Sequence, residues 1–134
     1  MLSQTARYAL RTLGVLANRP DEWVLGKDMA SQTGIPANYL SKILNQLRKR
    51  GLVQSQKGWG GGFLLQDHAL SVPIREVVEL FDGPRETGQC VFELQPCDAD
   101  HPCPLHQRWE RVRHEFQSML TTLTIGDLGR RIEP

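Results

Sequence analysis

A single glycine, Gly34, separates two stretches of helical spacing in the N-terminal half of the chain. The pattern predicts a short helix over Lys27–Thr33 and a second helix that starts at Ile35-Pro36 and runs to Arg50. Two helices joined by a tight glycine-containing turn form a helix-turn-helix. The second helix must bury one apolar stripe, which consists of Leu40, Ile43, Leu44 and Leu47.

The opposite face of the second helix is polar and has no acid. It carries Asn38, Tyr39, Ser41, Lys42, Asn45, Gln46, Lys49 and Arg50. Between residues 29 and 66 the sequence has five basic residues and no acidic one. An ordinary solvated helix face mixes both signs, so we favour a recognition helix that enters the major groove of DNA. Residues 1–66 have nine Lys or Arg against three Asp or Glu, whereas residues 67–134 have seven against twelve.

A glycine-rich turn follows the second helix. Leu52–Gln56 and Phe63–Gln66 are predicted strands, and residues 57–62 join them as a hairpin wing. The glycines let the backbone approach a phosphate closely, and Lys57 supplies charge. A nucleotide-binding loop is the alternative, but no Gly-Lys-Ser/Thr follows. The candidate DNA contacts are Asn38, Tyr39, Ser41, Lys42, Arg48, Lys57, Gly58, Trp59, Gly60 and Gly61.

These contacts are expected to differ in kind. Lys57 and Arg48 are assigned mainly to phosphate, and Asn38, Ser41 and Lys42 of the second helix to base edges. Trp59 is placed to touch a sugar or a groove.

All three cysteines and two of the four histidines lie between residues 90 and 106. Three thiolates and one imidazole supply the four ligands that a tetrahedral zinc site or a two-iron, two-sulfur cluster requires. Six residues separate Cys90 from Cys97 and five separate Cys97 from Cys103, which is unlike the close cysteine pairs of structural zinc. The alternative to a metal site is that the three cysteines are buried and unreactive.

The fourth ligand is expected to be His106 rather than His101, because Pro102 constrains the backbone of His101. Pro104 suits the first position of a helix, which predicts Cys103 as its N-cap, with a lowered thiol pKa, and His106 about one turn further in.

The flanking helices are predicted from the same spacing. Residues 1–18 form a first core helix, for which an organellar transit peptide is the alternative, and Ser71 is expected to cap a helix that ends at Gly83. The last helix carries a heptad-like seam of Leu105, Trp109, Val112, Phe116, Met119 and Leu123. This seam favours a twofold homodimer, which matches a palindromic DNA site, over packing onto its own domain.

At 134 residues the chain suits one domain with an appendage. The predicted fold is mainly α with a small β wing. It divides into a winged helix-turn-helix domain with a linking helix at 1–83, a cysteine-rich cluster-binding loop at 84–104, and a C-terminal dimerisation helix and tail at 105–134. No apolar run reaches the length of a membrane span, and no signal core precedes a cleavage site, so a soluble, cytoplasmic protein without membrane partners is expected.

The motifs together resemble the Rrf-two family of winged-helix regulators, whose members include the bacterial iron-sulfur cluster regulator and the nitric-oxide-sensitive repressor. The resemblance covers nearly the whole chain. It rests on Arg7–Leu10, Ile35–Leu47, Gly51–Val53, Gly58–Leu65, and the set Cys90, Cys97, Cys103 and His106.

The resemblance implies that the cysteines bind an iron-sulfur cluster with His106 as the fourth ligand. Arg7 and Tyr8 stand where four-iron members can have an acidic ligand, which favours 2Fe-2S over 4Fe-4S. One departure is that six residues lie between the first two cysteines, where the best-known members have five.

The expected function is DNA-binding transcriptional regulation controlled by an iron-sulfur cluster that senses iron, redox state or nitric oxide. A regulator with structural zinc or no metal is the first alternative. The second is a small thiol or electron-transfer protein that uses Cys103 with His106. A thiol or electron-transfer protein would need neither a recognition helix nor an acid-free wing. We therefore expect that the chain is not an enzyme.

Overall fold

The computed structural model describes residues 2–84 and 104–130 of the chain. The first half contains α1 (Gln4–Ala17), α2 (Gly26–Thr33), α3 (Ala37–Lys49), β1 (Val53–Gln56) and β2 (Gly62–Leu65). The second half contains the short 3-10 helix η1 (Asp67–Ser71), α4 (Ile74–Asp82), α5 (His106–Thr122) and α6 (Ile125–Leu128). The prediction of a mainly helical chain with a small β wing is confirmed. Among the described residues, no helix has the length and apolar character to cross a bilayer.

The helix α1 lies at the centre of the body. Ser3 caps it by accepting a hydrogen bond from the backbone N–H of Ala6 at 3.0 Å, which satisfies one of the free donors of the first turn. The buried residues of the helix recur at spacings of three and four, and α1 contacts α2, α3, α4, α6 and β2. The first core helix is therefore confirmed. Its contacts make it the element through which the others are connected.

The helix-turn-helix forms as the glycine pattern predicts. Gly34 ends α2 with φ at +75°, a left-handed value that glycine adopts without the usual steric cost. All four residues of the apolar stripe of α3 are buried in the main core. Each fully buried Leu or Ile contributes roughly 1.5–3 kcal/mol relative to an exposed one, so this stripe fixes which face of α3 turns outward.

The hairpin wing is antiparallel, with Val53 opposite Leu65 and Gln56 opposite Gly62. On the edge of β2 that does not face β1, Val24 forms an isolated antiparallel bridge with Phe63. It exchanges two backbone hydrogen bonds with Phe63, of 2.9 and 2.8 Å. The turn before α2 is thereby attached to strand β2 of the wing, a link that the sequence analysis did not predict.

The C-terminal helices begin at different residues than the sequence suggested. Ser71 lies in η1, and Pro73 occupies the capping position of α4. The helix α5 begins at His106, with Leu105 in the cap position, so the prediction that Cys103 caps this helix and that His106 lies one turn inside it is wrong. Pro104 lies in a turn before the helix. Its fixed φ does not by itself start a helix when the following residues are not yet helical.

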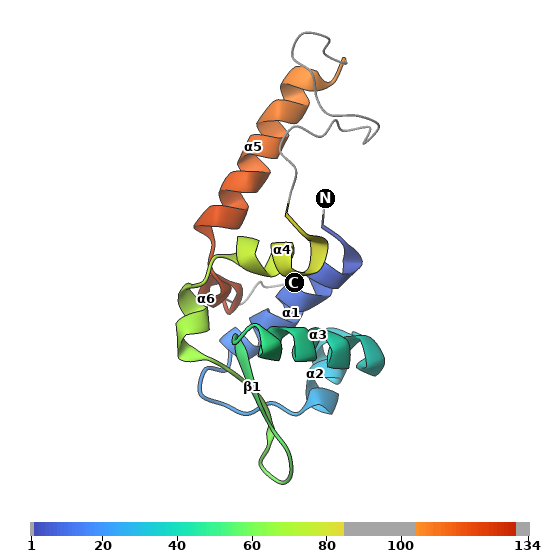
Figure 1. The fold of residues 1–134 in the computed structure, drawn as a ribbon, viewed down its shortest axis with the longest axis vertical. Helices are drawn as coiled ribbons and strands as arrows, with labels where there is room; N and C mark the ends of the chain where they lie inside the picture. Colours follow the sequence, from blue (N-terminus) through green and yellow to red (C-terminus); the bar gives the residue numbers. More distant parts are fainter. Residues whose placement is uncertain (1, 85–103, 131–134) are drawn as a thin grey trace.

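The helix α5 extends away from the body, at the end of the long axis opposite the hairpin (Figure 1). Within α5 only Leu120 is buried. It packs with Ile74 and Val78 of α4 in a small second core cluster. The following turn leads to α6, whose Ile125 belongs to the same core as α1 and α3. The lower end of α5 is therefore fixed to the body from both sides.

Candidate DNA-binding surface and metal ligands

The outward face of α3 is exposed along its whole length. The three residues assigned to base edges, Asn38, Ser41 and Lys42, are all exposed. Arg48 is exposed as well, and its guanidinium donates a 2.8 Å hydrogen bond to Oδ1 of Asn45 on the same face. The structure therefore brings the predicted helix contacts together on one surface, with amides, hydroxyls and cations side by side.

At the edge of this surface, the start of α2 meets the first half of α3 and strand β2 of the wing. A hollow of about 200 Å³ lies between them, lined by Gly26, Lys27, Ala37, Leu40, Ser41, Leu44 and Phe63. Ser41 is a predicted base contact, and Lys27 adds a cation from α2. The recognition helix and the hairpin are therefore neighbouring parts of one continuous surface.

Tyr39 contacts Tyr8 of α1, and Arg11 of the same helix packs on Tyr8 in turn. The sequence analysis did not predict that these two residues contribute to this surface. The ring of Tyr39 meets the ring of Tyr8 edge to face, with centroids 6.4 Å apart and planes at 72°. The guanidinium of Arg11 lies 5.1 Å from the centroid of the Tyr8 ring and donates a 3.0 Å hydrogen bond to the carbonyl of Thr33, the last residue of α2. Edge-to-face and cation-π contacts each add about 0.5–1.5 kcal/mol beyond area burial. The side chain of Tyr39 nevertheless remains half exposed.

The wing tip requires its glycines. Gly58 and Gly60 have φ values of +91° and +76°, in the left-handed region. A Cβ on Gly61 would lie 2.2 Å from the carbonyl oxygen of Gln56, which no side chain tolerates. The tip therefore presents mostly backbone, together with the exposed side chains of Lys57 and Trp59.

Of the four predicted metal ligands, the structure describes His106 alone. Its side chain is partly exposed at the first residue of α5. Cys90, Cys97 and Cys103 lie outside the described residues. Among residues 2–84 and 104–130, no group of three His, Cys, Asp or Glu side chains is arranged to hold a metal ion. The ligand set therefore remains a prediction, with one ligand placed at the upper end of α5.

The segment that carries the cysteines follows α4, and the end of α4 is bonded to α1. Asp82, the last residue of α4, accepts a 3.1 Å hydrogen bond from the backbone N–H of Ser3 and a second one from its hydroxyl. Ser3 is also the cap of α1. This contact joins residues 79 positions apart, and no local pattern could have predicted it.

The start of α4 is bonded to the lower end of α5. Ile74 donates its backbone N–H to the carbonyl of Leu123 at 2.9 Å, and Ile125 donates to Val72, also at 2.9 Å. Thr124 and Asp127 form a reciprocal capping box at the start of α6. The backbone N–H of Thr124 donates to the Asp127 carboxylate and lowers its pKa from the usual value. Both ends of α4 are thus fixed by specific hydrogen bonds.

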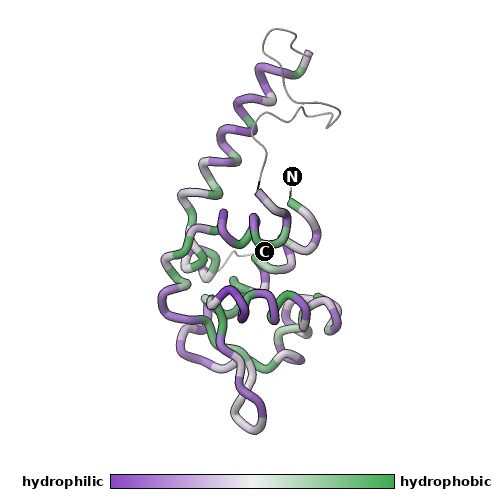
Figure 2. The backbone as a smooth tube through the Cα atoms, in the orientation of Figure 1, coloured by the Kyte–Doolittle hydropathy of each residue, from purple (hydrophilic) through white to green (hydrophobic). Residues whose placement is uncertain are grey.

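Within the part of the chain that the structure describes, most of the apolar seam of α5 is exposed. Leu105, Val112, Met119 and Leu123 are exposed, while Trp109 and Phe116 are partly buried. Figure 2 shows apolar positions spaced along α5 between hydrophilic stretches. A contiguous row of this kind is typical of a surface that a partner covers.

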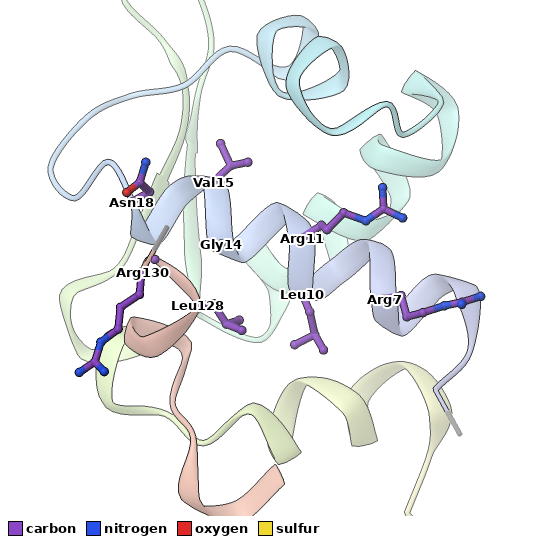
Figure 3. A pocket seen from close by; sticks show the side chains of 9 residues that line it. Arg7, Leu10, Arg11, Gly14, Val15, Asn18, Leu128 and Arg130 are labelled. Atoms are coloured by element: carbon purple, nitrogen blue, oxygen red, sulfur yellow. The ribbon is translucent and has the colours of Figure 1, made fainter. Parts of the chain in front are cut away.

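A separate hollow of about 500 Å³ lies between α1 and α6 (Figure 3). Leu10, Leu128 and Val15 contribute apolar walls, and three arginines lie around it. Figure 3 shows that Arg7 and Arg130 lie at opposite ends of the hollow, and Arg11 is directed toward the end of α2. Because the guanidinium groups diverge, the hollow does not present a focused anion site.

Comparison with known proteins gives a consistent result. A family model described as "Rrf2: Iron-dependent Transcriptional regulator" matches residues 2–131. A protein of Aquifex aeolicus assigned as an HTH-type transcriptional regulator is 35% identical over 130 residues, covering 96% of this chain and 90% of the relative. The HTH-type transcriptional regulator IscR of Klebsiella pneumoniae is 31% identical over 128 residues, covering 95% of this chain and 78% of its own length.

Solved structures share the fold. CymR, named the global cysteine regulator of B. subtilis, superposes with a TM-score of 0.77 at 23% identity, covering 99% of this chain and 98% of CymR. The IscR of T. potens superposes with a TM-score of 0.69 at 20% identity, covering 100% of this chain and 93% of that one. The winged-helix architecture is therefore confirmed by structural likeness as well as by the order of the elements.

Proposed function

The chain belongs to the Rrf2 family of transcriptional regulators, and from this premise we propose that it binds operator DNA as a homodimer under the control of an iron-sulfur cluster. It is a regulator and not an enzyme. The observation that carries the proposal is the exposed, acid-free face of α3 beside a glycine-built wing. The description of the matching family as iron-dependent supports the metal.

On this surface, cations and polar side chains have different tasks. Lys57 at the wing and Arg48 near the end of α3 neutralise phosphates and set the position of the protein on the duplex. Asn38, Ser41 and Lys42 point away from the buried stripe of α3 and reach base edges in the major groove. Tyr39, fixed by Tyr8, fits a contact at the edge of the groove.

These tasks are separable by salt titration. Lys57→Ala should weaken binding to all sequences alike and reduce the slope of log affinity against log salt by about one. Ser41→Ala should change the preference between sites and leave the slope unchanged. Arg75→Ala is the matched control, because Arg75 is a cation of α4 paired with Glu79. An unchanged salt slope for Lys57→Ala would show that the wing does not contact phosphate through this residue.

The proposed ligands of the cluster are Cys90, Cys97, Cys103 and His106. Three thiolates with one imidazole match the donor set of a two-iron, two-sulfur centre, which we favour over 4Fe-4S. Such a cluster would supply sensitivity to iron supply, redox state or nitric oxide. The position of His106 at the first residue of α5 supports its role as a ligand, because ligation there would attach the start of α5 to the segment that follows α4.

The cluster is tested by anaerobic absorption. The protein purified without oxygen should be brown and contain iron, whereas zinc is colourless. Cys97→Ala should lose the visible absorption and the iron, while His114→Ala, an exposed histidine of α5, should keep both. A colourless parent protein with bound zinc would favour the alternative regulator with structural zinc. Full absorption in Cys97→Ala would disprove the ligand assignment.

The dimer is proposed from the seam of α5. Its exposed apolar residues recur at heptad-like spacing, which suits the same helix of a second copy. A twofold axis between two such helices gives two recognition helices related by symmetry, and their operator is then palindromic.

The cluster is proposed to act as an allosteric ligand of DNA binding. In the sequence, the cysteine segment follows Asp82 and precedes α5, and Asp82 accepts hydrogen bonds from Ser3, the cap of α1. Helix α1 in turn contacts α3 and holds Tyr39 through Tyr8. Ligation of the cluster therefore affects an element that is connected to the recognition helix. A coupling of about 1–3 kcal/mol, or roughly 5- to 150-fold in affinity, is usual for such linkage.

The coupling is measured by comparing cluster-loaded and cluster-free dimers on the natural promoter at one salt concentration. The dimeric state of both forms is checked by sedimentation. The expected result is a difference in affinity of at least about fivefold. Equal affinities on every site tried would make the metal a structural element and exclude the sensor.

A further inference from the structure

Arg113 of α5 is a cation whose hydrogen bonds are only partly satisfied. Its side chain is 19% exposed, and its Nη2 group donates a hydrogen bond to Oε1 of Glu110, one turn earlier on the same helix. Its Nη1 atom is buried and has no hydrogen-bond partner in the part of the chain that the structure describes. A buried charged donor without an acceptor costs free energy, because nothing replaces the water that it has lost. The free N–H group therefore indicates that an acceptor belongs beside it.

The side of α5 that carries Arg113 also carries His106. The two residues are seven positions apart, which is close to two helical turns and places them within about 20° of one another around the axis. Trp109, between them, is partly buried as well, whereas Arg108 and Arg111, which face other directions, are exposed. The shielded side of this end of α5 thus holds both the proposed metal ligand and the incompletely paired cation.

The guanidinium of Arg113 is directed toward His106. Side chains on a helix lean toward its N-terminus. The hydrogen bond to Glu110 shows this lean, because the acceptor lies three residues N-terminal of Arg113. Glu110 is four residues from His106, or about 6 Å along the helix axis. The free N–H group therefore lies within about one turn of the proposed ligand.

An iron-sulfur cluster has the chemistry of the missing acceptor. Its sulfur atoms accept hydrogen bonds, and such bonds are among the factors that set the reduction potential of a cluster. One added electron makes the metal centre more negative by one charge, and a nearby cation stabilises that reduced state. Glu110 offsets the charge of Arg113 only in part, because its side chain is 41% exposed and water screens it.

We propose that Arg113 sets the reduction potential of the metal centre: its Nη1–H group donates to a sulfur of the cluster ligated by His106, and its charge makes that cluster easier to reduce. The inference rests on the cluster proposed above and adds a residue outside the four ligands. The step concerned is the one-electron reduction of one iron from Fe(III) to Fe(II), in which no bond forms or breaks.

The test is an anaerobic redox titration of the full-length, cluster-loaded protein with dithionite and mediators, followed by visible absorption. At a fixed solution potential, Arg113→Gln should shift the ratio of reduced to oxidised cluster about tenfold toward the oxidised form, a fall of about 59 mV for one electron. Arg113→Lys keeps the charge and should recover most of this shift. Arg111→Gln is the matched control, because it removes an exposed arginine of the same helix and should leave the potential unchanged.

Glu110→Gln provides a second test with the opposite sign. Without its carboxylate the charge of Arg113 is unopposed, so the reduction potential should rise. The shift in the ratio should be smaller than tenfold, because the exposed carboxylate is already screened. A general loss of packing would disturb the cluster in both variants and would not give shifts of opposite sign.

The outcomes are distinct. If the parent protein holds no cluster, the proposed function fails and this inference with it. If the parent holds a cluster and Arg113→Gln has the same potential as Arg111→Gln, only the role of Arg113 is refuted. If neither variant of Arg113 can be loaded with a cluster, Glu110→Gln decides: a raised potential supports the proposal, and an unchanged or lowered one overturns it.

Discussion

The helices α3 and α5 are both amphipathic and of similar length, at 13 and 17 residues, yet their apolar stripes have opposite environments. The four stripe residues of α3 are at most 2% exposed, whereas Val112 and Met119 of α5 are 50% and 39% exposed. The spacing of apolar residues therefore predicts which face of a helix seeks a partner. It does not show whether that partner is the same chain.

The comparison predicts the largest loss of stability for α3. Leu47→Ala removes a fully buried side chain and should lower the free energy of unfolding by about 2–5 kcal/mol, through lost burial and the cavity left behind. Denaturant titration at one protein concentration measures this. Gln46→Ala, exposed on the same helix, is the control and should change stability by no more than about 0.5 kcal/mol. Equal losses for both would contradict the packing of α3.

The matching change in α5 should act on association. Val112→Glu places a charge in the proposed interface twice, once per copy, and should weaken the dimer by about 2–5 kcal/mol. The helicity of the protomer should be retained. Sedimentation over a concentration series, with circular dichroism, checks both statements. His114→Ala, on the opposite side of α5, should leave the dimer intact. A dimer unaffected by Val112→Glu would place the interface elsewhere.

The hydrogen bonds between the end of α4 and the cap of α1 belong to the proposed connection between α5 and α3. They can be weakened without changing either helix. Asp82→Asn keeps the shape of the side chain but replaces one of the two carboxylate oxygens, each of which accepts a hydrogen bond from Ser3, by an amide nitrogen that cannot accept one. Stability should fall by roughly 1 kcal/mol. The ratio of DNA affinities between cluster-loaded and cluster-free protein should move toward one, and titration of both forms measures it. Glu79→Gln is the control, since Glu79 pairs with Arg75 on the same helix. An unchanged ratio would mean that coupling follows another route.

The smallest expected effect concerns the turn that connects α5 to the body. The backbone N–H of Thr124 lowers the pKa of Asp127, so the ionised carboxylate stabilises the fold at pH values above the usual pKa of an aspartate. This contribution is lost as pH falls through the lowered folded value. Asp127→Asn should therefore flatten the acid side of the profile of melting temperature against pH. Asp67→Asn, an exposed carboxylate, is the comparison variant. Identical profiles for the parent and Asp127→Asn would exclude the cap as a source of acid sensitivity.

Local patterns in the sequence determined most of the helices and the wing. The spacing of Leu40, Ile43, Leu44 and Leu47 fixed the buried face of α3, because helical geometry places such residues in one row. Gly34 and the glycines of the wing marked turns, because their positive φ values disfavour other residues. The start of α5 was predicted too early, since proline tolerates a first helical turn without requiring one.

The contacts that connect these elements were decided only by the tertiary structure. Ser3 meets Asp82, Tyr8 meets Tyr39, and Val24 pairs with Phe63, across 79, 31 and 39 positions of sequence respectively. Periodicity reports the relation of a residue to its neighbours within a few turns, and it contains no information about which distant segment will pack there. The sequence by itself therefore determined the exposed polar face of α3 and identified Cys90, Cys97, Cys103 and His106 as candidate metal ligands. The packing of α1 against α3, α4 and α6 was decided only by the tertiary structure, because those contacts exist only once the core has formed. The proposed coupling between the start of α5 and the exposed face of α3 depends on that packing.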